Sequence, residues 1–281
     1  MSYSAIAPGH VAVITGGASG IGLAAAMRFA GLGMRVAIAD LGADRLQGAA
    51  AQLAKAGAAD VIAAEVDVAD AVALSGLAAS VTKRWGGTDV LMLNAGIGPD
   101  SAITGPAEVW QRILAVNLWG VINGAQAFLP GMLARGQDGL IICTGSKQGI
   151  TTPPGNPAYN VSKAGVKVFA EALEHDLRNR DGARISAHLL IPGFVFTGLT
   201  QGDRREKPAA AWTADETVDF MFASLQKGDF YILCPDNDVP RALDEKRILW
   251  AAGDIVENRP PLSRWHKDHA EGFKTMLAKS P

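Results

Sequence analysis

The hydrophobic positions of this chain fall into short apolar runs, separated by longer stretches in which apolar residues recur at helical spacing. Runs that are rich in β-branched residues and apolar on both faces are typical of strands buried inside a parallel sheet. The pattern predicts about seven strands, at 11–15, 35–40, 60–67, 89–94, 140–144, 184–191 and 230–234.

The stretches between these runs predict helices at 23–33, 43–56, 70–85, 106–134, 157–180, 214–227 and 242–252. Strands that alternate with helices in this way imply an α/β fold, a doubly wound parallel sheet of the Rossmann type with right-handed crossovers and helices on both faces. A chain of 281 residues that is 48% hydrophobic can bury one sizeable core. We therefore expect a single domain over 1–281.

Two segments depart from the alternation. Residues 194–213 follow the end of a strand and mix apolar side chains with charges, which is typical of a lid over a binding site. Residues 235–281 contain one predicted helix and several prolines. We expect them to form a tail that packs on the same domain.

Composition narrows the classes of partner. A formal net charge of −2 leaves no basic excess for nucleic acid, so we expect a small-molecule partner. The most apolar helical stretch, 113–129, contains three amide side chains and is shorter than a span of about 20 apolar residues, so no membrane is expected. Cys143 and Cys234 lie in apolar runs and the first ten residues lack a secretion signal, which indicates reduced thiols and a cytoplasmic location.

Polar and glycine-rich residues follow the predicted strands. Because the carboxyl ends of parallel strands meet at one edge of a sheet, where ligands bind in such folds, we expect a pocket there. The residues at these ends are Thr15-Gly16, Asp40, Asp67, Asn94-Ala95-Gly96, Thr144-Gly145-Ser146 and Pro192-Gly193.

The sequence TGGASGIG joins the first strand to the first helix. Gly16 permits a tight turn, Gly20 lets the backbone approach a pyrophosphate at the helix N-terminus, and Gly22 permits close packing of helix on strand. No Lys-Ser or Lys-Thr follows, which argues against a phosphate-transferring loop. A structural turn that binds no nucleotide is the alternative to a dinucleotide site.

Asp40 ends the second strand, at a position where a carboxylate accepts hydrogen bonds from an adenosine ribose and repels a 2′-phosphate. No cation directly follows it, which favours NAD over NADP. Arg35 or Arg45 turning toward the ribose would oppose that preference.

Tyr159 and Lys163 are four positions apart, so they share one face if the stretch from Pro157 onward is helical. A nearby ammonium favours the phenolate and lowers a tyrosine's pKa from about 10 toward the range of an acid or base catalyst. The hydroxyl of Ser146 is placed to hold a substrate oxygen. Taken singly, these residues also fit a capping serine and a solvated helix face.

Together, these motifs resemble the short-chain dehydrogenase/reductase family in kind and in order, over about 11–197. The resemblance implies that Asp67-Val68 contacts adenine, and that Pro192-Gly193 with Thr197 holds the nicotinamide carboxamide. The cofactor-binding residues implied in this way are Gly16, Ser19, Gly20, Ile21, Asp40, Asp67, Val68, Asn94, Ala95, Gly96, Tyr159, Lys163, Pro192, Gly193 and Thr197.

The resemblance also implies a chemistry, in which a secondary alcohol and a ketone are interconverted by direct hydride transfer with NAD(H). Tyr159 would be the acid or base, Lys163 would lower its pKa and hold the ribose, and Ser146 would bind the substrate oxygen. Asn117 would position a water. Family members pair through the two long helices, so a homodimer, or a homotetramer, is expected.

The sequence indicates the class of the substrate but not its identity. The residues that flank the predicted site are mostly apolar and favour a hydrophobic or aromatic substrate: Ile97, Ile150, Pro154, Phe194, Phe196, Leu199 and Trp212. Lys147, next to the serine, and the lid cations Arg204, Arg205 and Lys207 are candidates for a cation at the pocket.

Other functions and sites are weighed against this one. No metal site is expected, because His266 and His269 in the tail lack further ligands nearby. The main alternative is a sensor or scaffold of the same fold that binds NAD without turnover, although such a protein needs no intact catalytic set. An epimerase or dehydratase is the other alternative, but those relatives usually have a larger carboxyl-terminal substrate domain.

Overall fold

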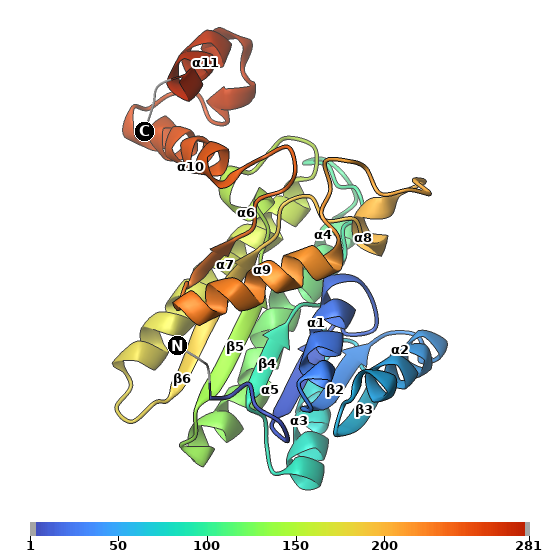
Figure 1. Ribbon diagram of the computed structural model, residues 1–281. Helices are drawn as coiled ribbons and strands as arrows, with labels where there is room; N and C mark the ends of the chain where they lie inside the picture. The colour runs from blue at the N-terminus through green and yellow to red at the C-terminus, as the bar shows by residue number, and fades with distance from the viewer. Residues whose placement is uncertain (1–3, 279–281) are drawn as a thin grey trace.

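The computed structural model describes residues 4–278 and contains one seven-stranded sheet whose paired strands all run parallel. Its order is β3-β2-β1-β4-β5-β6-β7, so the winding direction reverses between β1 and β4 (Figure 1). The strands are β1 (Val11–Thr15), β2 (Arg35–Asp40), β3 (Asp60–Glu65), β4 (Val90–Leu93), β5 (Gly139–Thr144), β6 (Ile185–Ile191) and β7 (Tyr231–Leu233). The doubly wound α/β fold is confirmed.

Helices form a layer on each face of this sheet. One layer consists of α1 (Gly20–Gly31), α2 (Ala43–Ala56) and α9 (Ala214–Lys227). The other consists of α3 (Ala71–Trp85), α4 (Ala107–Leu114), α5 (Gly120–Arg135) and α7 (Pro157–Asn179).

Successive residues of the central strands face the two helix layers in turn. In β1, Val11 and Val13 pack with α3, α5 and α7, while Ala12 and Ile14 pack with α1, α2 and α9. All four are 2% exposed or less. Because side chains of a strand point to opposite faces in turn, burial on both faces requires the continuous apolar run that is seen in the sequence.

Both cysteines are free thiols inside this core. Burial raises the pKa of Cys143 to about 12, and the pKa of Cys234 also to about 12. Since the thiolate is the reactive form of cysteine, neither residue has the character of a nucleophile.

The predicted single helix over 106–134 is wrong at one place. A π-helical segment, η1 (Ala115–Trp119), separates α4 from α5 and contains Asn117, which is completely buried. The reason is a tertiary one, because the Asn117 side chain bonds to the backbone of Ile97. The third strand is also shorter than predicted and ends at Glu65, which leaves Asp67 in the loop that follows.

The apolar helix Ala107–Arg135 is the one helix among residues 4–278 that is long and apolar enough to cross a membrane. Here it packs against α3 and α7, and 39% of its most apolar window is buried. Core helices of proteins without membrane spans are often as long and as apolar, so this helix is only weak evidence for a membrane span.

The tail projects away from the sheet as a small helical unit (Figure 1). It consists mainly of α10 (Arg241–Val256) and α11 (Ala270–Ala278), joined by short 3-10 turns, and α10 contacts the body at α6 (Gln148–Thr151). Trp250 packs edge-on against Phe273 of α11. The sequence predicted only one, shorter helix in this region.

Candidate active site

A cavity of about 740 Å³ opens at the carboxyl edge of the sheet, where the strand order reverses between β1 and β4. Ligands bind at this position in open α/β sheets. Every predicted catalytic or cofactor-binding residue except Asn117 lines it: Gly16, Ser19, Gly20, Ile21, Asp40, Asp67, Val68, Asn94, Ala95, Gly96, Ser146, Tyr159, Lys163, Pro192, Gly193 and Thr197.

The glycine turn delivers the N-terminus of α1 to this cavity. Gly16 and Gly20 have φ values of 64° and 53°, in the left-handed region that favours glycine. A Cβ on Gly22 would lie 2.1 Å from the carbonyl oxygen of Gly16, so no larger residue fits there. The first turn of α1 contains no acidic residue, so its free N–H groups suit an anion such as a pyrophosphate.

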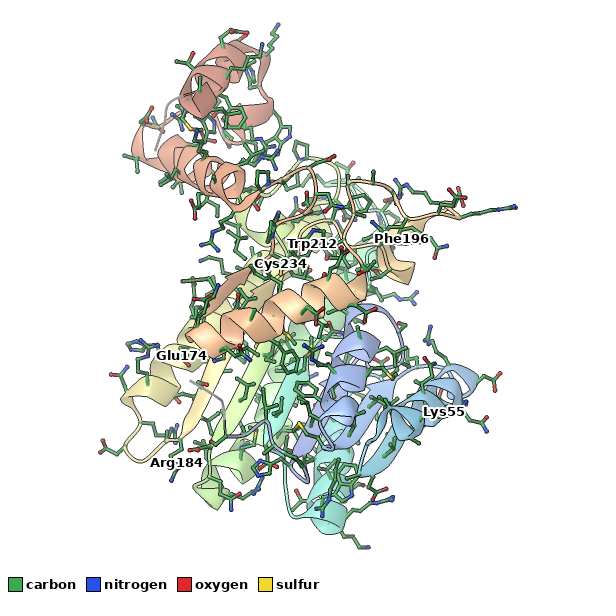
Figure 2. All side chains as sticks on the ribbon, viewed as in Figure 1. Lys55, Glu174, Arg184, Phe196, Trp212 and Cys234 are labelled. Carbon is green, nitrogen blue, oxygen red and sulfur yellow. The ribbon has the colours of Figure 1, made fainter. Side chains whose placement is uncertain are left out.

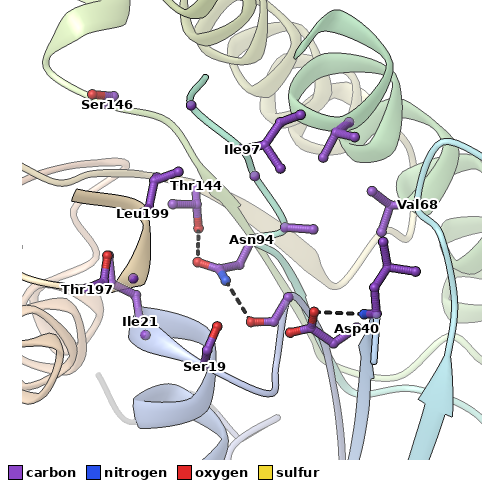
Figure 3. Close-up of a pocket in the computed structure, with 18 of the residues that line it drawn as sticks. Ser19, Ile21, Asp40, Val68, Asn94, Ile97, Thr144, Ser146, Thr197 and Leu199 are labelled. Carbon is purple, nitrogen blue, oxygen red and sulfur yellow. Dashed lines mark hydrogen bonds between the residues drawn. The ribbon is translucent and has the colours of Figure 1, made fainter. Parts of the chain in front are cut away.

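Asp40 is held at the far end of the cavity by the backbone (Figure 3). Its Oδ2 accepts the N–H of Ala18 at 3.0 Å, and its Oδ1 accepts the N–H of Leu41 at 2.8 Å. Arg45 also lines the cavity, with its guanidinium 3.3 Å from Asp40 Oδ1. A cation therefore does adjoin Asp40, although none follows it directly in sequence.

Asn94 lines the cavity and joins the ends of three strands there; Figure 3 shows its bond with Thr144 of β5. Its side-chain amide donates to the carbonyl oxygen of Thr15 at 3.3 Å, and its Oδ1 accepts the hydroxyl of Thr144 at 3.2 Å. Thr15 Oγ1 in turn accepts the N–H of Asn94 at 2.9 Å. Sequence reasoning identified Asn94 but gave no role to Thr15, whose only signal was a hydroxyl at the end of a buried strand.

Asn117 lies behind the cavity wall. Its Oδ1 accepts the N–H of Ile97 at 2.8 Å, and its Nδ2 donates to the Ile97 carbonyl at 2.9 Å. A Cβ on Gly96 would be 3.5 Å from Asn117 Oδ1 and 3.7 Å from Lys163 Nζ. Asn117 thus fixes the loop after β4 directly beside the lysine.

Tyr159 and Lys163 lie on successive turns of α7, which begins with the cap Asn156 and with Pro157 in its first turn. Lys163 is 4% exposed, and its Nζ donates to the Thr144 carbonyl at 2.9 Å. Burial lowers the pKa of Lys163 to about 8.

The predicted direction of the Tyr159 pKa is wrong in this structure. Burial raises the pKa of Tyr159, and its hydrogen bond with Ser146 opposes only part of that effect. The Lys163 Nζ lies 5.8 Å from the centre of the Tyr159 ring. The ammonium thus lies over the Tyr159 ring while it donates its hydrogen bond to a backbone carbonyl.

The four cations that the sequence suggested for the substrate pocket do not line the cavity: Lys147, Arg204, Arg205 and Lys207. Lys147 is 15% exposed and pairs with Asp236 and Asp244. Arg204 donates to the Thr200 carbonyl and lies over a phenylalanine ring, and Lys207 donates to the Ala211 carbonyl. Instead, Arg112 of α4 and Arg45 are the arginines in the lining. Sequence reasoning missed Arg112, which has no motif of its own.

Of the seven apolar residues expected around the substrate, only Ile97 and Leu199 line the cavity. Phe196 and Trp212 both lie in the segment 194–213 (Figure 2), where Trp212 packs against Phe220 of α9. Leu199 points inward, since a Cβ on Gly98 would be 3.2 Å from its Cδ1. This segment folds back on itself, because the N–H of Phe196 donates to the Trp212 carbonyl at 2.8 Å and the N–H of Trp212 donates to the Phe194 carbonyl at 2.9 Å.

Comparison with known proteins agrees with this geometry. The family model for short chain dehydrogenases matches residues 10–208. The 1-deoxy-11-beta-hydroxypentalenate dehydrogenase of Streptomyces avermitilis is 34% identical over 245 residues, covering 85% of this chain and 89% of that protein.

Two solved structures are similar over most of the chain. A short chain dehydrogenase/reductase from Burkholderia phymatum, in complex with NAD, has a TM-score of 0.81 and 30% identity, covering 91% of this chain and 97% of that one. The L-sorbose reductase of Gluconobacter frateurii, complexed with NADPH and L-sorbose, has a TM-score of 0.69 and 30% identity, covering 78% and 90%. This chain is an oxidoreductase that belongs to the short-chain dehydrogenase/reductase family.

Proposed function

We propose that the protein interconverts a secondary alcohol and a ketone by direct hydride transfer with NAD(H). The observation that supports this most is that Ser146, Tyr159 and Lys163 line the same cavity as the glycine turn. The bound nicotinamide supplies the hydride acceptor or donor. The protein binds and orients the cofactor and the substrate, and it transfers the proton.

The residues present fit such a cofactor. The open N–H groups at the start of α1 suit a pyrophosphate, and the close contact between Gly22 and Gly16 leaves the backbone free of side chains at that point. Asp40, fixed by two backbone N–H groups, suits the hydroxyls of an adenosine ribose. Asp67 and Val68 are proposed to contact the adenine, and Thr197 the carboxamide.

The proton is assigned to Tyr159. Because burial raises its pKa, Tyr159 holds its proton near neutral pH and can donate it to the oxygen of a ketone as hydride arrives at the carbon. In the reverse direction the phenolate accepts the proton of the alcohol. Ser146 is proposed to bind the same substrate oxygen, Lys163 to orient the ribose, and Asn117 to position a water beside Lys163.

A panel of secondary alcohols and ketones tests this proposal, with the absorbance of the reduced nicotinamide as the signal. We expect oxidation of hydrophobic or aromatic alcohols with NAD, at a rate that rises with pH because the base form of Tyr159 is needed. Ketone reduction should be faster near neutral pH than at alkaline pH, since it consumes a proton. Activity with polar polyols alone would contradict the expected substrate class. Binding of NADH without any turnover would instead favour a sensor.

The preference for NAD over NADP is proposed to depend on Asp40. We expect Asp40→Ala to shift the ratio of kcat/KM toward NADP by about tenfold or more, since a carboxylate beside a 2′-phosphate is strongly repulsive and its loss also frees Arg45. Steady-state kinetics with both cofactors measure the ratio. Asp44→Ala, an exposed aspartate in the first turn of α2, is the matched control and should leave it unchanged. An unchanged ratio in Asp40→Ala would assign the preference to other residues.

We further propose a homodimer that forms through α4, α5 and α7. The outer side of these helices and of η1 exposes Trp119, Val161 and Val168 at 55%, 49% and 62%, which is an apolar surface suited to a partner. A homotetramer remains a second expectation, and a cytoplasmic location agrees with two free buried thiols. Sedimentation of the purified protein measures the oligomeric state.

A further inference from the structure

A buried ion cluster lies directly behind the serine loop. The Nζ of Lys147 is 2.6 Å from Asp244 Oδ2 and 3.2 Å from Asp236 Oδ2. The side chain of Lys147 is 15% exposed, that of Asp244 is 5% exposed and that of Asp236 is 7% exposed. An ion pair this deeply buried is held in one geometry, because each charge depends on its partner for solvation.

The lysine belongs to the loop that presents Ser146. The backbone N–H of Lys147 donates to the Pro192 carbonyl at 3.2 Å, and the Lys147 carbonyl accepts the N–H of Ile150 at 3.1 Å in the short helix α6. Both the main chain and the side chain of Lys147 are therefore held in place. Because Ser146 is the preceding residue, its backbone is held in place with them.

The carboxylates of the cluster reach the nicotinamide-binding segment as well. Asp236 Oδ2 accepts the backbone N–H of Phe194 at 3.3 Å. A Cβ on Gly193 would lie 2.6 Å from Asp236 Oδ2 and 2.9 Å from Lys147 Nζ, so the backbone of Gly193 rests against the ion pair. One cluster thus contacts both the serine loop and the segment that follows β6.

Asp236 and Asp244 come from the tail. Asp236 lies in the turn after β7, and Asp244 lies in the first turn of α10. Burial raises the pKa of Asp244, and Lys147 opposes that effect, as expected for two carboxylates that share one ammonium. The tail is joined to the body at α6, the element that Lys147 precedes.

We infer that Lys147 is a positioning residue, through which Asp236 and Asp244 of the tail hold Ser146 and Gly193 in the arrangement that hydride transfer requires. The catalytic part of this inference rests on the proposed function. None of the three side chains touches the cavity, so the cluster acts on catalysis only through the backbone that it fixes.

The test compares Lys147→Met with the wild-type protein. We expect kcat to fall by about 10- to 100-fold, because a displacement near 1 Å of a reacting group has an effect of that order. The KM for NAD should change less than threefold, since the glycine turn and Asp40, which are proposed to hold the pyrophosphate and the ribose, belong to other elements than the cluster. Lys147→Arg retains the cation and should recover part of the lost kcat. Lys83→Met, an exposed lysine in the last turn of α3, is the control and should match wild type.

Hydrogen exchange followed by mass spectrometry gives a reading that does not require turnover. The amides of 145–151 and 192–197 should exchange faster in Lys147→Met, while the remaining segments of the sheet stay unchanged. Asp244→Asn, which keeps the contact of Lys147 with Asp236, is the second variant if Lys147→Met does not fold, and it should show the same local increase.

The outcomes separate this inference from the proposed function. A kcat within twofold of wild type, or faster exchange spread evenly over the whole chain, would overturn the positioning role. If the wild-type protein itself turns over no alcohol or ketone, the proposed function fails, and the exchange of the two segments still decides the inference. Faster exchange confined to them supports it, and unchanged exchange there overturns it.

Discussion

Tyr159→Phe is expected to lower kcat by about 10²–10⁴-fold while NADH still binds. The substitution removes one hydroxyl and keeps the ring, so the packing of α7 is preserved. The lost atom is the proton donor and acceptor of the proposed reaction, and no other phenol lines the cavity among residues 4–278. Steady-state kinetics measure kcat, and the fluorescence of bound NADH measures affinity.

Tyr231→Phe is the matched control for this variant. Tyr231 is 47% exposed on β7, and its hydroxyl donates to Glu171 at 2.6 Å. Its loss should leave kcat near that of wild type. Near-normal turnover in Tyr159→Phe would rule out Tyr159 as the acid and base, whereas loss of NADH binding would indicate damage to the cavity.

Lys163→Met is expected to abolish turnover and at the same time stabilise the fold at pH 7 by about 1–3 kcal/mol. Burial lowers the pKa of Lys163 from its ordinary 10.5 to about 8, and each pKa unit corresponds to about 1.4 kcal/mol. Methionine has a similar length and no charge to desolvate, although the Thr144 carbonyl loses its donor. Thermal and urea unfolding measure the free-energy difference.

This stabilisation should depend on pH. Between about pH 8 and 10.5, folded wild-type protein binds fewer protons at Lys163 than the unfolded chain does, so its stability rises with pH over this window. The variant lacks this rise, and its advantage should be largest below pH 8 and shrink toward pH 10.5. Lys167→Met, one turn further on α7 and paired with Glu171 at 34% exposure, should show no such trend. A variant less stable than wild type at pH 7 would contradict the expected cost of the buried charge.

Much of the fold could be predicted because local signals agree with the tertiary structure. The helix 43–56 ends at Gly57 with φ of 104°, and the helix 214–227 begins at a capping box between Thr213 and Glu216, so both predicted ranges match α2 and α9. Apolar runs gave the strands for the same reason. The predicted helix 106–134 differs from the structure at Asn117, where the deciding hydrogen bonds join its side chain to Ile97 in another segment.

The lining of the cavity was predictable to the extent that it lies in short motifs at the ends of strands. The glycine turn, Asp40 and the Tyr159 and Lys163 pair each require a particular residue at a particular spacing. Lys147 and Trp212 have no such motif. The direction of Lys147 depends on Asp236, which is 89 positions away in sequence, and that of Trp212 depends on its packing against Phe220 of the following helix. The sequence therefore located the site but not the partners that turn these two side chains away from it.

The π-helical segment also sets a rule for protein engineering. Ile113, Asn117 and Val121 are all buried and four positions apart, yet positions at this spacing drift by about 40° per step in a regular α-helix. The wider turn of η1 offsets that drift, in agreement with the burial of all three side chains. A one-residue deletion within 115–119 would rotate everything on its N-terminal side by about 100° relative to α5. Segment exchange with a relative should therefore transfer these five residues as one unit, because the phase of the whole helix is set there.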